Sequence, residues 1–451
     1  MADKKPNVIP AAGEREHFTS QWGFILACVG SAVGLANVWA FPYRVAQFGG
    51  AGYVIPYLIC AILLGLIGVA AEIAFGRWGK AGPMGTFRKA LESKGKNGKI
   101  GTGLGVIPVL GSLAIATGYA IVVGWVLRYL WTSITGSLFT AADTGAYFGA
   151  ITGNFGSVGW HLLALAISVA IMMAGVVDGI ERINKIMMPL FFVLLIYMVI
   201  RVAFLDGVGE GYRFLLIPDW SAMANPKIWA FALGQCFFSL SLAGSGTVVF
   251  GSYTTPKENC FQSSFWIVFL DTISAIMATL IIIPAMFAFN MNPEISGPPL
   301  VFIVLPQIFG GMVGGRIFSA IFFLTLVFAA VPAIVNLFET PIEAVQQHFK
   351  LSRKKASAVV VGVATVAGLF MESGDIVGAW MDLVSIYVVP IGAIFSAVLF
   401  FWFMGKEFGR EQVQIGREKT VGGWFVPTGR YIFVVITIIV FIGGMLIPGM
   451  V

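Results

Sequence analysis

The stretch FILACVGSAVGLANVWAFPY, residues 24–43, decides how this chain folds, because it is an apolar helix with an interruption in its middle. It begins as an ordinary membrane helix, breaks at small residues and Gly34, and resumes with the amide of Asn37. A lipid-facing helix must pair every backbone N–H and C=O group within itself. The interruption therefore indicates that something polar occupies the middle of the membrane here.

The composition is that of a helical membrane protein with many spans. The 451 residues are 58% hydrophobic and 11% charged, with a mean hydropathy of +0.89. A span needs about 20 apolar residues, and the sequence predicts eleven, the ninth of them short. They lie at 21–43, 51–76, 104–131, 160–178, 186–206, 226–252, 263–289, 314–345, 357–371, 376–404 and 430–449.

The lysine and arginine residues predict the orientation, since positively charged loops stay in the cytoplasm. With residues 1–20 inside and the spans alternating, 22 of the 28 basic residues fall on the inner side. The C-terminus is then external. The net charge of +6 follows from this topology and is not read as a nucleic-acid surface. The polar start, which lacks a cleavable signal, and the absence of an Asn-x-Ser/Thr sequon favour a prokaryotic inner (plasma) membrane.

The sixth span is interrupted like the first, because the small residues Ala243-Gly244-Ser245-Gly246-Thr247 lie between its apolar runs. Two interrupted helices five spans apart predict two inverted five-helix repeats, 21–206 and 226–404, with an eleventh helix in 430–451. The fold class is therefore all-α and polytopic, with helices 1 and 6 unwound at the midplane, where substrate and ion sites lie in such repeats. The alternative is that the small residues only let helices pack closely.

Asp271 is the clearest candidate for chemistry, because a carboxylate deep in a membrane is costly. It lies about 12 Å into the seventh span at 1.5 Å per residue. With the amide of Asn37 and the hydroxyl of Ser239 it would form an oxygen-lined cation site. The alternative is a carboxyl group held neutral or paired with arginine. Glu72 and Glu339, nearer the inner helix ends, are predicted to be structural partners of arginine or of backbone N–H groups.

The resumed half of the first helix is predicted to hold an anion. Backbone N–H groups at a helix N-terminus attract negative charge, and those near Leu35 and Ala36 could bind a carboxylate. Tyr119 could add an O–H donor, or be an ordinary packed tyrosine.

The sequence gives no catalytic set. The three histidines lie near predicted helix ends, and no HExxH, GxSxG or P-loop motif occurs. The four cysteines have no metal-type spacing and are predicted to pack in the core. The chain is therefore predicted not to be an enzyme.

Several motifs in order resemble the neurotransmitter:sodium symporter family, which has the leucine-transporter fold. They are Arg15-Glu16-His17, GSAVGLANVWAFP, AEIAFGRWG at 71–79, GIERINKIMMP from Gly179, GQCFFSLSL at 234–242 and KLSRK at 350–354. The similarity extends over nearly the whole chain. An eleven-helix form is common among bacterial members of that family.

The resemblance implies sodium-coupled uptake of an amino acid or a close analogue by alternating access. It implies a first sodium site from the Ala32 carbonyl, Asn37, Ser239 and the substrate carboxylate, with Asp271 where asparagine is usual. An acid at that position resembles the chloride-independent members. The implied substrate pocket contains Ser31, Leu35, Ala36, Ile115, Tyr119, Phe238, Ser241, Gly244, Ala333, Asn336 and Leu337. Phe238 resembles the lid over the substrate, and Tyr253 an inner-gate residue near Arg15.

The chain also departs from the family pattern. Pro332 and Ala333 replace the two hydroxyl residues of the second sodium site, leaving the carbonyls of Gly30, Val33 and Ala329. We therefore expect one sodium ion and no chloride.

The gates and the substrate turn depart as well. Ala40 replaces the outer-gate arginine, so Arg44 is the substitute, with Asp382 as its partner. Gln347 replaces the inner-gate acid, and Ala36 replaces a glycine beside the substrate carboxylate.

Two other classes remain open. One is a proton-coupled transporter of an amino acid or amine with the same architecture, and the other is a channel or a sensor that does not transport. The sequence leaves the substrate and the oligomeric state undetermined.

Overall fold

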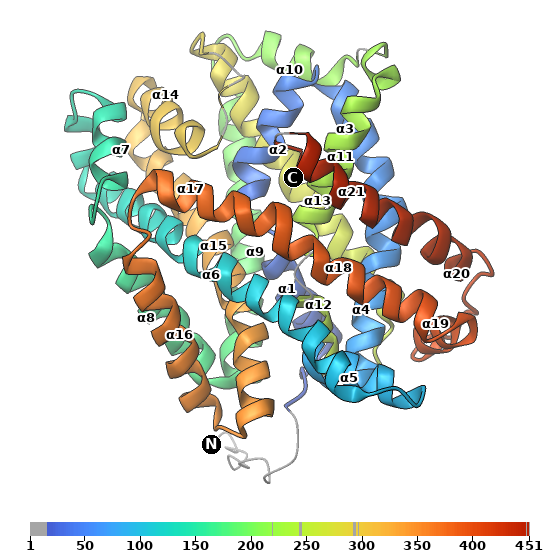
Figure 1. Ribbon diagram of the computed structural model, residues 1–451. Coiled ribbons are helices and arrows are strands. Elements are labelled where there is room, and N and C mark those ends of the chain that lie inside the picture. The colour runs from blue at the N-terminus through green and yellow to red at the C-terminus, as the bar shows by residue number, and fades with distance from the viewer. Residues whose placement is uncertain are drawn as a thin grey trace, which may run out of the picture.

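The computed structural model describes residues 16–218, 220–242, 246–291, 295, 297–447 and 449–450. These residues form helices and connecting segments, with no strand among them (Figure 1). The all-helical prediction is therefore confirmed for the described part of the chain.

Seven helical segments are long and apolar enough to cross a membrane. They are Ala51–Gly79 (α3 Ala51–Cys60, η1 Ala61–Gly65, α4 Leu66–Gly79), Gly98–Thr135 (α6), Val176–Ala203 (η3 Val176–Glu181, α9 Arg182–Ala203), Cys260–Ala288 (α13), Gly315–Phe349 (α15), Gly374–Phe403 (α17 Gly374–Leu383, η6 Val384–Val388, α18 Val389–Val398, η7 Leu399–Phe403) and Phe425–Leu446 (α20 Phe425–Thr428, η8 Gly429–Phe433, α21 Val434–Leu446). The bent pair α1 (Gln21–Ala32) and α2 (Leu35–Gln47) makes an eighth candidate.

The other three predicted spans coincide with shorter helices. These are α8 (Val158–Met173), the pair α11 (Pro226–Ser239) and α12 (Gly246–Ser252), and α16 (Arg353–Leu369). The described helices thus include seven or eight segments of spanning length, and the count of eleven stays a prediction.

The remaining helices lie in the connections. They are α5 (Pro83–Ser93), η2 (Ser137–Thr140), α7 (Thr144–Thr152), α10 (Gly209–Leu216), η4 (Ala222–Ala224), η5 (Leu300–Val304), α14 (Leu305–Gly311) and α19 (Lys406–Gln414).

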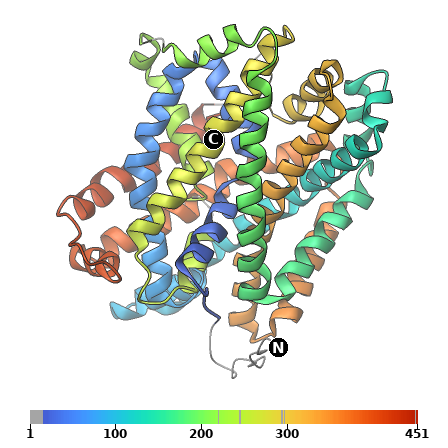
Figure 2. The same cartoon turned by 180° about the vertical axis from the view of Figure 1, so that it is seen from behind.

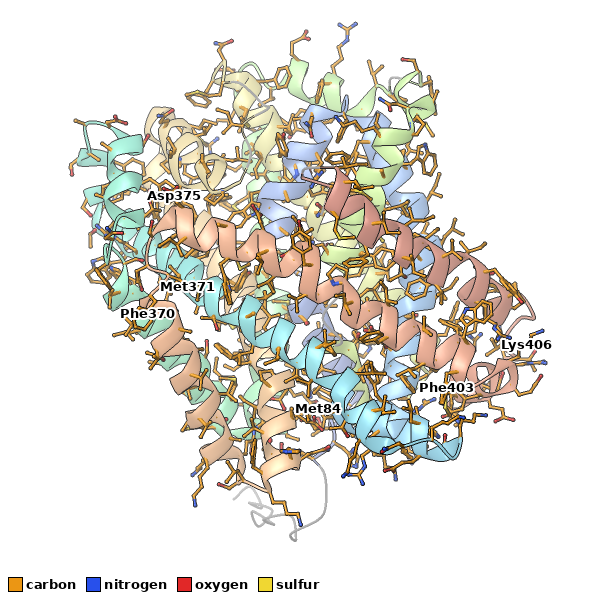
Figure 3. The ribbon with its side chains drawn as sticks, in the orientation of Figure 1. Met84, Phe370, Met371, Asp375, Phe403 and Lys406 are labelled. Atoms are coloured by element: carbon orange, nitrogen blue, oxygen red, sulfur yellow. The ribbon has the colours of Figure 1, made fainter. Side chains whose placement is uncertain are left out.

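The bent pair lies in the centre of the molecule. α1 packs against α9, α13 and α15, and α2 packs against α13 and α11; Figure 2 shows this side of the bundle. On the opposite side, α6 and the segment Gly374–Phe403 run diagonally across the front. Figure 3 labels Asp375 near one end of that segment and Phe403 at the other. The central helix is therefore enclosed by packed helices.

Many large apolar side chains on the outside of the bundle are exposed. On α9, Val193 and Ile200 are 59% and 53% exposed, and α16 and α21 carry similar residues. Such surfaces suit contact with lipid chains, which need no polar partner. The chain is accordingly a membrane protein.

Glycines allow α4 and α12 to approach closely. A Cβ on Gly76 would lie 1.9 Å from the Val248 carbonyl oxygen, and one on Gly251 would lie 2.4 Å from that of Ile73. Membrane helices commonly pack through small residues in this way. The contact fixes α12, which follows the predicted second break.

Candidate functional site

The first helix is interrupted where the sequence predicted. α1 ends at Ala32 and α2 begins at Leu35, with a 56° bend between them. Asn37 stabilises the turn, because its Oδ1 accepts from the Gly34 N–H at 3.2 Å, as capping side chains do. The second predicted break, at Ala243 to Thr247, lies partly outside the described residues, and Gly244 is among those not described.

Asp271 is the centre of a buried polar cluster beside this interruption. It has no exposed surface. Asn37 Nδ2 donates to Asp271 Oδ1 at 2.8 Å, and Ser239 Oγ donates to Oδ2 at 2.8 Å. Tyr57 Oη reaches Oδ2 at 3.5 Å. The structure thus brings together Asn37, Ser239 and Asp271 from α2, α11 and α13.

The carboxyl group of Asp271 has neutral partners. Among the described residues, no ion pair within 4.0 Å includes Asp271. The alternative in which an arginine balances it is therefore wrong for this part of the chain. A carboxylate buried without a positive partner is costly, so this cluster favours the binding of a cation or a proton.

A cavity of about 370 Å³ adjoins the cluster. Nine of the eleven predicted substrate residues line it: Ser31, Leu35, Ala36, Ile115, Tyr119, Phe238, Ser241, Ala333 and Leu337. Ala32 and Ser239 of the predicted sodium site also reach its wall. Residues of the predicted substrate pocket and of the predicted sodium site therefore line the same cavity.

Polar contacts fix the two interrupted segments around the cavity. The Leu35 N–H donates to Tyr119 Oη at 3.2 Å. Ser241 has a φ of +53° and donates to the Ser31 carbonyl at 3.1 Å. Because the oxygen of Tyr119 accepts from Leu35, its hydroxyl hydrogen remains able to donate to a bound group.

The prediction for Asn336 was wrong. Its side chain does not line the cavity. Asn336 is 2% exposed, and its Nδ2 donates to the Ala27 carbonyl at 3.0 Å. Asn336 lies three residues after Ala333 on α15. Its side chain therefore points in a different direction around the helix axis and contacts Ala27 of α1.

Sequence reasoning missed part of the cavity wall. It missed Trp39, Trp125, Gln235, Val377 and Met381. Val377 and Met381 come from α17, which lies far away in the chain and only meets the cavity in three dimensions. Trp39 follows Leu35 at helical spacing, which was a usable signal.

The outer end of the cavity contains the predicted gate residues. Arg44 and Asp382 both line it, but no ion pair within 4.0 Å joins them. The Arg44 guanidinium lies 4.5 Å from the centre of the Phe231 ring, and its Nε and Nη1 have no hydrogen-bond partner among the described residues. The predicted Arg44–Asp382 pair is therefore not formed in this structure.

A polar network away from the cavity wall joins Tyr253 to α15 and α16, near the helix ends predicted to face the cytoplasm. Tyr253 Oη donates to Glu339 Oε1 at 2.7 Å, and Arg353 Nη2 donates to Glu339 Oε2 at 2.6 Å. This confirms Glu339 as a structural partner of arginine. Arg15, the other predicted inner-gate residue, lies outside the described residues. Glu72 differs from its prediction, since it accepts from the Thr247 hydroxyl.

The four cysteines are buried and unpaired with one another, which confirms that they pack in the core. Gly30, Val33 and Ala329, the predicted remnant of a second sodium site, are also buried.

A broken central helix beside a cavity and a buried acidic cluster, inside a lipid-facing bundle, is the architecture of a membrane transporter. The chain belongs to the Sodium:neurotransmitter symporter family, whose profile matches residues 15–147 and 146–448. This is a family of transporters, so the prediction that the chain is not an enzyme is confirmed.

Individual relatives agree with this assignment. The chain is 33% identical over 366 residues to a sodium-dependent transporter of Haemophilus influenzae, covering 79% of each chain. It is 29% identical over 437 residues to one of Methanocaldococcus jannaschii, covering 91% of this chain and 87% of that protein. The crystal structure of MhsT in complex with L-phenylalanine matches with a TM-score of 0.85 at 33% identity, covering 96% of this chain and 100% of MhsT.

Proposed function

We propose that this chain is a symporter that couples inward sodium flow to uptake of an amino acid or a close analogue by alternating access. The observation that carries the proposal is the buried Asp271 carboxyl group, bonded to Asn37 at the helix interruption and to Ser239, which lines the cavity. The cluster has acceptor oxygens and, in the described part of the chain, no positive partner, which suits a hard cation.

Sodium is a transported substrate in this proposal. Its first site uses the Ala32 carbonyl, the side chains of Asn37, Ser239 and Asp271, and the carboxylate of the bound amino acid. Because α2 provides Asn37 and α11 provides Ser239, a cation here joins the two predicted halves, 21–206 and 226–404. Occupancy then favours closure of the cavity.

The amino acid carboxylate would be held by the N–H groups at the start of α2, near Leu35 and Ala36, and by the hydroxyl of Tyr119. The remaining wall is largely apolar, with Trp39, Ile115, Trp125, Phe238 and Met381. Such a lining favours a large apolar side chain, because burying apolar surface stabilises binding. The L-phenylalanine in the MhsT complex is a ligand of this class.

Asp271 would make transport independent of chloride. A fixed negative charge at the first sodium site would replace a bound chloride ion, because either charge balances the cation. The same group would carry a proton on the return step.

Alternating access would use the two ends of the cavity. The Tyr253–Glu339–Arg353 network would hold the inner side shut, while Arg44 and Asp382 line the cavity without an ion pair between them. We infer eleven spans in an inner membrane, with the N-terminus in the cytoplasm and the C-terminus outside. Pairing of Arg44 with Asp382 would close the outer end around the substrate.

A proton-coupled transporter is the second candidate, and it is favoured because no described residue forms an ion pair with Asp271. A proton on Asp271 would neutralise the cluster as a cation does.

Binding and transport measurements separate the two candidates. A thermal-shift screen of the twenty amino acids, with and without sodium, identifies ligands, because a ligand bound only by the folded state raises the melting temperature. Uptake of the best ligand into proteoliposomes is then measured under a sodium gradient and under a proton gradient alone. We expect uptake with sodium only. Uptake driven by protons without sodium would favour the second candidate, and a steady current without saturable exchange would indicate a channel.

A further inference from the structure

An unpartnered oxygen lies where the family resemblance expects a second cation site. Pro332 and Ala333 provide no side-chain oxygen there. Asn184, on α9, is 1% exposed, and its Oδ1 has no hydrogen-bond partner within the described residues. Buried acceptors are nearly always paired with protein, water or an ion. The Asn184 oxygen is therefore free to accept a bond from, or to coordinate, a group that is not part of the protein.

The position of this oxygen is defined by Gly30. A Cβ added to Gly30 would lie 1.9 Å from Asn184 Oδ1 and 2.8 Å from the Pro332 Cβ. The amide oxygen thus lies against the backbone of α1, where α1, α9 and α15 pack together. Glycine is needed at position 30, because any side chain would overlap the oxygen.

The orientation of the amide is also defined. Asn184 Nδ2 donates to the Ile180 carbonyl at 2.8 Å, within the π-helical turn η3. A reversed amide would place its oxygen against the Ile180 oxygen and its N–H groups against the Gly30 Cα. The acceptor end therefore points to α1. Single π-helical turns are frequent at functional sites.

Backbone carbonyls next to this position also lack helical donors. α1 ends at Ala32, and the last carbonyls of a helix have no partner within it. Val29 O accepts from Val33 N, and Ser31 O accepts from Ser241 Oγ. Among the described residues, no backbone N–H from a loop or from another helix donates to the Gly30 carbonyl. On α15, Pro332 has no N–H, so the Phe328 carbonyl loses its donor.

We propose that Asn184 supplies the side-chain oxygen of a second monovalent-cation site between α1, α9 and α15. Its amide oxygen takes the place of the hydroxyl groups that Pro332 and Ala333 lack, and the carbonyls of Gly30, Val33 and Ala329 complete the set. These oxygens are all neutral acceptors, which suits a sodium ion, whereas calcium and magnesium sites usually include carboxylates. The inference rests on the proposed sodium coupling, and it assigns two sodium ions where the sequence predicted one.

Direct sodium binding tests the proposal without requiring transport. Radioactive sodium bound at saturation is measured on the purified full-length protein in detergent, with the amino acid found in the screen. At the lowest sodium concentration that saturates the wild type, we expect two sodium ions per wild-type chain and one for Asn184→Ala, because the second site is then weakened by about tenfold or more. Asn184→Asp keeps an oxygen at this position and is expected to bind two.

Asn336→Ala is the matched control. Asn336 is similarly buried and also has an unpartnered Oδ1 among the described residues. Its Nδ2 donates to the Ala27 carbonyl of α1, one turn before Gly30. We expect this variant to bind two sodium ions. Gly30→Ala, which displaces the Asn184 oxygen without replacing Asn184, is expected to bind one.

Several results would overturn the proposal. A single sodium ion in the wild type would mean that Asn184 holds a water molecule. Two ions in Asn184→Ala, or loss of one in Asn336→Ala alone, would exclude Asn184 as the ligand. Ser239→Ala is expected to weaken the first sodium site and to leave the second. If the wild type binds no sodium at all, the proposed sodium symport itself is contradicted. A melting temperature near that of the wild type in excess sodium shows that each variant is folded.

Discussion

Asp271 lies on α13 with the Asn37 amide on one carboxylate oxygen and the Ser239 hydroxyl on the other. Three helices that are far apart in the sequence meet at this one side chain. Because the carboxyl group is completely buried, its charge is balanced only by what binds next to it. In the proposed mechanism, the anion requirement of transport therefore depends on this residue.

Replacing Asp271 by asparagine is expected to create a chloride requirement. Uptake by the wild type should be unchanged when gluconate replaces external chloride. Uptake by Asp271→Asn should fall by about tenfold or more in gluconate, because the cation site loses a full negative charge. Asp375→Asn, an exposed carboxylate on α17, is the control and should behave as the wild type. Chloride dependence of the wild type, or its absence in Asp271→Asn, would contradict the assignment.

Glu339 is the second residue whose replacement has a defined outcome. Its side chain is fully buried and that of Arg353 is 14% exposed, with 2.6 Å between Oε2 and Nη2. Glu339→Gln leaves a mostly buried cation without its partner and should destabilise the folded protein by about 3 kcal/mol. The melting temperature measures this loss.

The surface pair Arg88–Glu92 provides the comparison. Its side chains are 62% and 47% exposed, so Glu92→Gln should change the melting temperature little. The double variant Glu339→Gln with Arg353→Gln should recover part of the loss, because the unpaired charge is then absent. Equal effects of Glu339→Gln and Glu92→Gln would show that the inner network does not stabilise this state.

At the scale of elements, glycines determine which helices reach α1 and α12. Gly23 and Gly30 of α1 leave room for Glu181 and Asn184 of the segment Val176–Ala203. Gly76 and Gly251 leave room for the backbones of α12 and α4. The interrupted helices are thus held by close backbone contacts instead of large side chains, which is typical of membrane helices.

Gly76→Ala should disrupt the contact between α4 and α12. The new Cβ would lie 1.9 Å from the Val248 carbonyl oxygen, which is backbone and cannot rotate away. Overpacking of this kind costs about 1 to 3 kcal/mol, and we expect a lower melting temperature and reduced uptake. Gly103→Ala on α6, with no atom within 4 Å of the added Cβ, is the control and should be neutral. A neutral Gly76→Ala would mean that the two helices move apart easily.

At the scale of the whole molecule, the fold places the cavity between the bent pair α1 and α2, the long helix α6, and α11, α15 and α17. Residues from both predicted halves of the chain share its wall. The proposed transport cycle requires the two ends of this cavity to open on opposite sides of the membrane. The orientation of the chain is therefore a testable part of the proposal.

Single cysteines test the orientation, since the four native cysteines are buried and should react slowly. Lys96 and Asp206 are exposed in loops predicted to lie inside and outside, respectively. A membrane-impermeant maleimide should label Asp206→Cys in intact cells and Lys96→Cys only after the cells are permeabilised. The reverse labelling would show that the orientation predicted from the lysine and arginine residues is wrong.

Local features of the sequence were sufficient to predict the class of the fold, the interruption at Gly34 and the deep position of Asp271. They were sufficient because a long apolar run, a broken backbone and a buried charge each have a large energetic consequence in lipid. Resemblance to a family also predicted nine of the residues that line the cavity. The orientation of Asn336 away from the cavity, the positions of Val377 and Met381 in its wall and the contact of Asn184 with Gly30 became evident only in three dimensions. Those facts depend on how distant helices rotate and pack against one another, which no single segment of sequence contains.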